Sequence, residues 1–239
     1  MKSSRGITEK KGIARAQAKE KIFQQLRADI ISQKLKPGQA IREDELAQSY
    51  GISRTPIREM LRKLEQEDLV KVVPNKGAFV SELTQKDIEE VLEIRISLES
   101  AAARLAASKL TSEDLAQLKE IEKQLDSAVK LEDSILSFEA DSRLHKLILR
   151  AAGNVRAHRI INNLMGQILR IRFISGHKPG RIFTTVSEQK QIVKALISMD
   201  PDRAEVAMRV HLTNAMKLLL PSSDMDKKFE EFVRNSFSL

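Results

Sequence analysis

The sequence predicts a mainly α-helical protein with two domains, an N-terminal winged helix-turn-helix and a C-terminal all-α helical bundle. Two observations predict this division. Residues 20–83 combine short amphipathic helical patterns with one hairpin pattern, whereas residues 84–221 keep helical spacing and contain no convincing strand. The 239 residues contain no cysteine, so disulfides and thiolate metal sites are excluded.

The stretch from Gly51 to Glu65 predicts a tight turn followed by a helix. Gly51 can adopt a positive φ and end the preceding helix. Ile57, Leu61 and Leu64 follow at i, i+4 and i+7, which places them in one apolar stripe. The stretch is therefore expected to bury one side of its helix.

The same helix carries polar residues at its start. Ser53 or Thr55 can cap it, and Arg54 stands at its N-terminal end. Arg58 lies about 100° round from the apolar stripe, because successive residues turn by that angle. A helix with one buried side and arginines at its N-terminal end suits insertion into a DNA major groove.

The elements before this helix follow from spacing and from helix-stopping residues. Residues 1–19 show no firm periodicity and predict a flexible basic arm. A first amphipathic helix begins near residue 22 and ends near Lys34, before the stop at Lys36-Pro37-Gly38. Residues 39–41 predict a short extended piece, and residues 43–50 a second helix.

The wing is predicted from two β-rich segments that flank a Pro/Gly turn. Residues 69–73 and 78–82 are the segments, and Pro74-Asn75-Lys76-Gly77 is the turn. Lys76 stands beside Gly77, where the backbone can approach a phosphate or a groove closely.

Charge supports a nucleic-acid partner. The formal net charge is +8; residues 1–83 hold 17 basic and 11 acidic residues, and residues 84–239 hold 24 and 22. The excess of positive charge lies in the part of the chain that contains the arginine-bearing helix. Charge alone is explained equally well by a basic surface that binds no nucleic acid. No run is long enough to cross a membrane and no secretory h-region is present, so we expect a cytoplasmic protein without a membrane partner.

These residues resemble the DNA-binding domain of GntR-family transcription regulators. The resemblance rests on Pro37-Gly38, on Glu43 with Leu46-Ala47, on Gly51 to Glu59 with its Ser-Arg-Thr-Pro-x-Arg core, and on the Pro74/Gly77/Val80 pattern. It implies a bacterial, nucleoid-associated protein that binds double-stranded operator DNA. The DNA-contacting residues that follow are Arg42, Ser53, Arg54, Thr55, Arg58, Lys76 and Gly77. Some relatives have an arginine where this chain has Asp44, and the nearby Arg42 is the expected substitute.

The second half is predicted to contain six or seven helices. Thr84 and Thr111 cap the first two, and later helical patterns occupy residues 132–151, 155–175, 184–198 and 201–219. Residues 222–239 predict a tail or a short C-terminal helix. Such a bundle is long enough to enclose a pocket.

This half resembles the FCD effector-binding domain of the FadR subfamily. The resembling residues include Asp87-Ile88 through Arg95, Leu98-Glu99, Asp141-x-x-x-His145, Ala151 to Asn154 and His211-Leu212. The resemblance implies that residues 84–221 form an effector-binding and dimerisation domain.

Asp141 and His145 lie four residues apart on one helix, so they can share a divalent metal or form a simple ion pair. The family resemblance implies a zinc- or nickel-type ion held by these two residues and His211. Gln189 stands where relatives have a further histidine, and its neutral carbonyl is a poorer ligand. The alternative is a metal-free polar pocket in which Gln189 binds the effector or a water.

A buried arginine needs an anionic partner. Arg95 can pair with Glu99, its i+4 neighbour, while the resemblance implies that it binds the carboxylate of a small organic acid effector. Arg172 is a second candidate, with a surface charge as the simpler interpretation.

The sequence therefore predicts a DNA-binding transcription regulator that binds a palindromic operator as a homodimer. Repression is the expected mode of regulation. One alternative is a metal-dependent helical-bundle enzyme, although the sequence shows no nucleophile elbow, phosphate loop or paired catalytic carboxylates. The other is a nonspecific nucleoid-type protein, whose affinity for DNA would depend on salt and not on sequence.

Overall fold

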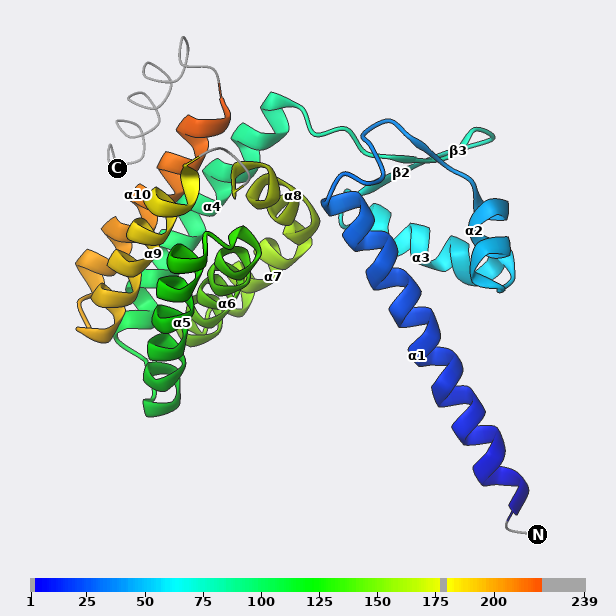
Figure 1. Cartoon of the computed structure of the whole chain (residues 1–239), viewed down its shortest axis with the longest axis horizontal. Coiled ribbons are helices and arrows are strands. Elements are labelled where there is room, and N and C mark those ends of the chain that lie inside the picture. Colours follow the sequence, from blue (N-terminus) through cyan, green and yellow to red (C-terminus); the bar gives the residue numbers. More distant parts are fainter. Residues whose placement is uncertain (1–2, 177–179, 221–239) are drawn as a thin grey trace. The chain divides into compact units, whose positions relative to one another are not determined.

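The computed structural model describes residues 3–176 and 180–220, with side chains described for residues 17–175 and 180–220. This part of the chain forms ten helices and three short strands (Figure 1). It divides into two compact units; the first contains residues up to Leu83 together with Asn163–Arg170, and the second contains the remainder. No described helix is long and apolar enough to cross a membrane.

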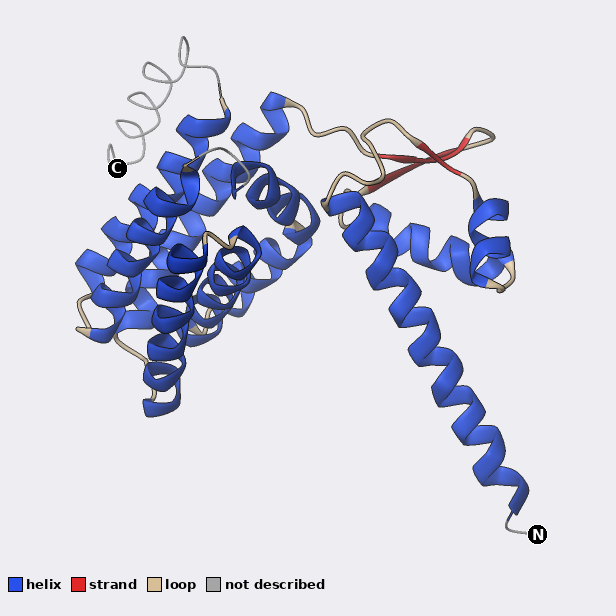
Figure 2. Ribbon diagram, in the orientation of Figure 1, coloured by secondary structure: helices blue, strands red, loops and turns tan. Residues whose placement is uncertain are grey.

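The first unit has the winged helix-turn-helix architecture that the sequence predicts. All three strands of the described residues belong to it (Figure 2). Its elements are α1 (Ser3–Ile31), β1 (Ala40–Ile41), α2 (Glu43–Tyr50), α3 (Arg54–Gln66), β2 (Val70–Val73) and β3 (Gly77–Val80). The strands form one antiparallel sheet in the order β1-β3-β2. The core lies between α1, α3 and this sheet, where Leu26, Ile57 and Leu64 are almost fully buried.

The N-terminal segment differs from its prediction as a flexible arm. Residues 3–19 are helical and continue without a break into the first predicted helix, which ends at Ile31 and not near Lys34. Residues 9–21 are mostly Ala, Glu, Gln, Lys and Arg, all of which favour helix even where no apolar stripe is present. Periodicity alone therefore misses this part of α1.

The turn between α2 and α3 forms as predicted. Gly51 adopts φ 63° and its backbone N–H donates to the carbonyls of Ala47 and Gln48, which ends α2. Ser53 is the N-cap residue of α3 in an extended conformation, but its side chain makes no capping hydrogen bond. The Ser53 hydroxyl therefore makes no hydrogen bond to the N-terminal turn of α3.

The second unit is all-helical over its described residues. Its elements are α4 (Gln85–Ala107), α5 (Ser112–Leu131), α6 (Ser134–Ala152), α7 (Val155–Asn163), α8 (Met165–Gly176), α9 (Arg181–Ile197) and α10 (Pro201–Leu219), of which α8 is divided between the two units. α4 packs against α6 and α10, and α9 packs against α5 and α10. The single helical pattern predicted for residues 155–175 is two helices, α7 and α8.

Capping explains where the first helices of this unit begin. Thr84 and Thr111 each form a reciprocal capping box, with Asp87 and Asp114 respectively. Asp200 caps α10 immediately before Pro201. The segment 222–239, predicted as a tail or a short helix, lies outside the described residues.

Candidate nucleic-acid interface and candidate metal centre

α3 separates an apolar side from a polar side. Ile57, Leu61 and Leu64 are at most 2% exposed and hold the helix against the core. Arg54 and Arg58, one turn apart at the start of the helix, have side chains about 60% exposed. This is the division that major-groove insertion requires.

The remaining DNA-contact candidates are also exposed. They are Arg42, Ser53, Thr55, Lys76 and Gly77. In the wing, the N–H of Lys76 donates to the carbonyl of Val73, and Asn75 has φ 59°, as expected of a type II turn with Pro74 before it. Gly77 has φ 95°, a conformation that strains other residues.

Two of the arginines have partners that the sequence analysis did not identify. The Nε atom of Arg54 lies 2.5 Å from Oδ1 of Asp44. The Nε–H of Arg58 donates to Oε2 of Glu43 at 2.7 Å. Arg42 is the residue expected to replace the arginine that some relatives have at the position of Asp44. Its Nε lies 3.6 Å from Oε1 of Glu45. The acidic start of α2 therefore faces the arginines of α3.

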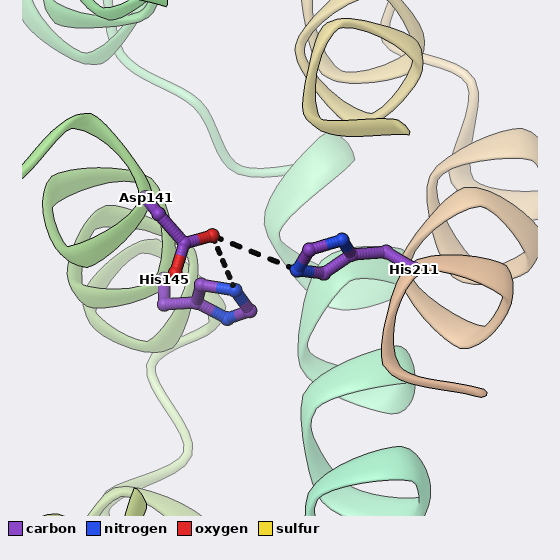
Figure 3. Close-up of side chains that lie close together, drawn as sticks. All are labelled: Asp141, His145 and His211. Carbon is purple, nitrogen blue, oxygen red and sulfur yellow. Dashed lines mark ion pairs between the residues drawn. The ribbon is translucent and has the colours of Figure 1, made fainter. Parts of the chain in front are cut away.

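A buried polar site lies in the second unit, where α6, α9 and α10 meet. Asp141 and His145 come from α6 and His211 from α10, and their side chains converge (Figure 3). Oδ1 of Asp141 lies 3.3 Å from Nε2 of His145 and 3.6 Å from Nε2 of His211. All three residues are at least 93% buried.

Carboxylates contact the far side of both imidazole rings. Nδ1 of His145 is hydrogen-bonded to Glu99 on α4, and Nδ1 of His211 lies 2.9 Å from Oε2 of Glu188 on α9. A hydrogen-bonded Nδ1 fixes the orientation of the ring and leaves Nε2 facing Asp141. Sequence spacing does not reveal these partners, because they lie on helices far apart in the chain.

The three ligand atoms fit a divalent metal. They lie within 4.8 Å of one another, and Nε2 of His145 is buried without a hydrogen-bond partner. One carboxylate oxygen and two imidazole nitrogens suit a zinc- or nickel-type ion. The Nε2 of Gln189 donates to Oδ1 of Asp141 at 2.6 Å, so the amide supports Asp141 in this arrangement and is not turned as a ligand.

Three buried arginines accompany this cluster. Arg95 donates from Nε to Glu99 at 2.6 Å, the i+4 pairing that its spacing allowed. Arg172 pairs with Asp141 and is 8% exposed, so its interpretation as a surface charge is wrong. The sequence could not reveal this, because the partner lies on another helix. Arg181, which the sequence analysis did not select, makes two hydrogen bonds of 2.9 Å to Glu188.

These contacts shift the acidities of the group. Burial raises the pKa of Asp141 and of Glu99, but the adjacent cations outweigh burial and hold both pKa values below their ordinary range. For Asp141 the neighbour that lowers the pKa most is Arg172, followed by His145. Burial lowers the pKa of His211, but Asp141 and Glu188 outweigh it and raise that pKa above its ordinary value. The carboxylates of Asp141 and Glu99 are therefore ionised near neutral pH.

A cavity of about 50 Å³ adjoins the cluster. Its wall includes Arg95, Asp141, Arg172, Gln189 and His211, so it unites both predicted effector residues with two of the predicted metal ligands. Three further polar atoms of its lining residues are buried without partners: Nε of Arg172, Oγ1 of Thr185 and Oε1 of Gln189. The cavity thus offers two donors and one acceptor that are unsatisfied.

Comparison with known families decides the identity. Residues 18–80 match the model of the bacterial regulatory proteins of the gntR family, and residues 90–214 match the model of the FCD domain. The chain belongs to the GntR family. It is therefore a DNA-binding transcription regulator and not an enzyme, and the resemblance drawn from the sequence is confirmed.

Individual relatives agree with this assignment. The HTH-type transcriptional repressor RspR of Escherichia coli K12 is 30% identical over 193 residues, which cover 81% of this chain and 85% of that protein. The HTH-type transcriptional regulator LutR of Bacillus subtilis 168 is 27% identical over 77% of this chain and 93% of that protein.

Among solved structures, E. coli McbR/YncC superimposes with a TM-score of 0.71 at 22% identity, covering 84% of this chain and 96% of that one. A GntR regulator from Rhodococcus sp. RHA1 superimposes with a TM-score of 0.70 at 21% identity, covering 85% and 98%. These likenesses establish the shared fold.

Proposed function

We propose that this GntR-family regulator is a repressor that binds a palindromic operator as a homodimer. The observation that carries the proposal is the polarity of α3, which buries Ile57, Leu61 and Leu64 while exposing Arg54 and Arg58 at its N-terminal end. Arginine is the side chain best suited to guanine O6 and N7 in the major groove. Two such helices related by a two-fold axis would read the two halves of a palindrome.

Phosphate and groove contacts are assigned to the other exposed candidates, which are Ser53, Thr55, Arg42 and the wing residues Lys76 and Gly77. Their exposure supports this assignment, and such contacts position the protein without reading sequence.

The helical unit is proposed to hold one divalent metal on Asp141, His145 and His211. The metal would supply a Lewis-acidic coordination position at the edge of the cavity. The carboxylates of Glu99 and Glu188 orient the two histidines for this role.

A small organic acid is the proposed effector. Arg95, Arg172 and Arg181 are matched one for one by Glu99, Asp141 and Glu188, so an added divalent cation would leave positive charge in excess and favour an anion. The unpartnered Nε–H of Arg172 and hydroxyl of Thr185 can donate to a carboxylate. The free Oε1 of Gln189 can accept from a hydroxyl or amino group on the same molecule.

The proposed mechanism is linkage between the two ligands. If the effector favours one arrangement of the winged units and DNA favours another, each ligand weakens the binding of the other by the same factor. A coupling of about 1–3 kcal/mol gives a change of about 5- to 150-fold.

Selection of bound sequences from random duplex DNA tests the DNA-binding proposal. The unmodified protein should enrich one palindrome, and Arg54→Ala or Arg58→Ala should abolish the enrichment because each removes a base-reading side chain. Lys63→Ala is the matched control, since it removes one positive charge from the same helix about 180° round from Arg54, where Lys63 lies over the Phe23 ring. It should retain the palindrome. Failure of the unmodified protein to enrich any sequence would contradict the proposal.

Elemental analysis tests the metal. Protein purified under metal-replete conditions should carry one divalent ion per chain, and His145→Ala or His211→Ala should lose it. His158→Ala removes a half-buried histidine outside the cluster and should keep it. Metal-free protein under the same conditions would count against the site.

A further inference from the structure

The first turn of α2 places two carboxylates against the two arginines proposed to read DNA. Asp44 contacts Arg54, and Glu43 contacts Arg58 across 15 positions of the chain. The arginines, Asp44 and, to a smaller degree, Glu43 remain exposed, so these ion pairs lie on the surface that DNA would approach. Neither pair includes a residue of the buried core of the unit.

Both carboxylates engage their arginine at the same atom. Each closest contact is made by Nε, at 2.5 Å for Arg54 and 2.7 Å for Arg58. Among the described residues, no hydrogen bond is donated by the terminal nitrogens of either guanidinium. An arginine paired through Nε has its two terminal N–H₂ groups available for another acceptor, and these can donate to O6 and N7 of one guanine together.

We propose that Asp44 and Glu43 are positioning residues that orient Arg54 and Arg58 and thereby make DNA binding selective. The inference rests on the proposed role of these arginines in reading DNA. A guanidinium that is already oriented loses less side-chain entropy when it meets a matching base. On a duplex without that base, the same carboxylates repel phosphates and partly neutralise the arginines, so nonspecific binding is weakened.

A simpler role for the acidic turn is stabilisation of α2, since carboxylates at a helix N-terminus interact favourably with the helix dipole. That role predicts a change in thermal stability when a carboxylate is removed. It predicts no change in the preference for one DNA sequence over another. The two roles are therefore separated by the ratio of two affinities.

The experiment measures the affinity of full-length Asp44→Asn, Asp44→Ala and Glu43→Gln for the selected palindrome and for a scrambled duplex, at one salt concentration. Affinity for the scrambled duplex should rise about two- to fivefold, the range expected for the loss of one exposed ion pair. Affinity for the palindrome should rise less or fall, so the ratio decreases. Asp44→Ala should decrease it more than Asp44→Asn, because asparagine retains an acceptor for Nε.

Glu59→Gln is the matched control. Glu59 is an exposed acid on α3 that lies 3.7 Å from Lys19, so the variant loses the same charge without touching either arginine. Its affinity ratio should equal that of the unmodified protein.

Two results would overturn the inference alone. One is an equal shift on both duplexes in the Asp44 and Glu43 variants, which is a general charge effect. The other is a change in melting temperature without any change in the affinity ratio. Absence of discrimination by the unmodified protein would overturn the proposed function itself, and this inference with it.

Discussion

Glu99 is the carboxylate that joins Arg95 and His145 in the buried site. It accepts from Nε of Arg95 and is hydrogen-bonded to Nδ1 of His145, and its side chain is 2% exposed. Burial alone would raise its pKa, but the contacts with Arg95 and His145 outweigh burial and hold that pKa below its ordinary range. The group is therefore a charged partner whose removal would leave Arg95 buried without an anion.

Glu99→Gln should lower the free energy of unfolding by about 3–5 kcal/mol, the range for breaking a buried ion pair from one side. Denaturant unfolding at neutral pH measures it. Glu120→Gln removes the exposed partner of Lys123 and should have no measurable effect. Equal effects of the two substitutions would contradict the assignment of Glu99.

At the residue scale, spacing in the sequence predicted side-chain pairs within one helix. It did not predict side-chain pairs between helices. The Arg95–Glu99 and Asp141–His145 neighbours follow from i, i+4 positions. The Glu99–His145 contact joins residues 46 positions apart. Such a contact depends on how α4 and α6 pack, and periodicity does not encode this.

At the scale of elements, the capping box of α5 shows how local sequence fixes a helix start. The backbone N–H of Thr111 donates to Asp114, which is the main reason that the pKa of this carboxyl lies below its ordinary value of 3.8. Burial opposes this shift, and the Thr111 hydroxyl and Arg150 add to it. A depressed folded-state pKa contributes stability above the ordinary value, and this contribution is lost as pH falls through the folded-state value.

Asp114→Asn should therefore cost about 1 kcal/mol of unfolding free energy at neutral pH, the usual value of a cap. The cost should shrink as pH falls below 3.8, where the native carboxyl also becomes neutral. Denaturant unfolding across this pH range measures it. Glu113→Gln, an exposed acid in the same turn, should change stability little; a pH-independent cost for Asp114→Asn would contradict the argument.

Helix boundaries were predictable where one residue acts locally: Thr84 and Thr111 begin helices, and Gly51 ends one. The break between α7 and α8 was not, since residues 155–175 keep helical spacing through Leu164. The helical start of α1 was also missed, because a helix without an apolar stripe leaves no periodic signal.

At the scale of the whole molecule, the sequence predicted both architectures because each has its own periodicity. The winged unit alternates short helices with a hairpin, and the second unit is helical throughout its described residues. The cavity could not be predicted, since its wall draws on residues from Arg95 to Ala215 on five helices. The proposed coupling between that cavity and α3 is a property that neither unit has alone.

The most direct test of the central claim measures the affinity of the purified protein for its selected palindrome and for a scrambled duplex at one salt concentration. The measurement is repeated with added zinc and a panel of small carboxylic acids. We predict a preference for the palindrome of at least about a thousandfold, and a change of about 5- to 150-fold in palindrome affinity with one of the acids. Equal affinity for both duplexes under every condition would contradict the account.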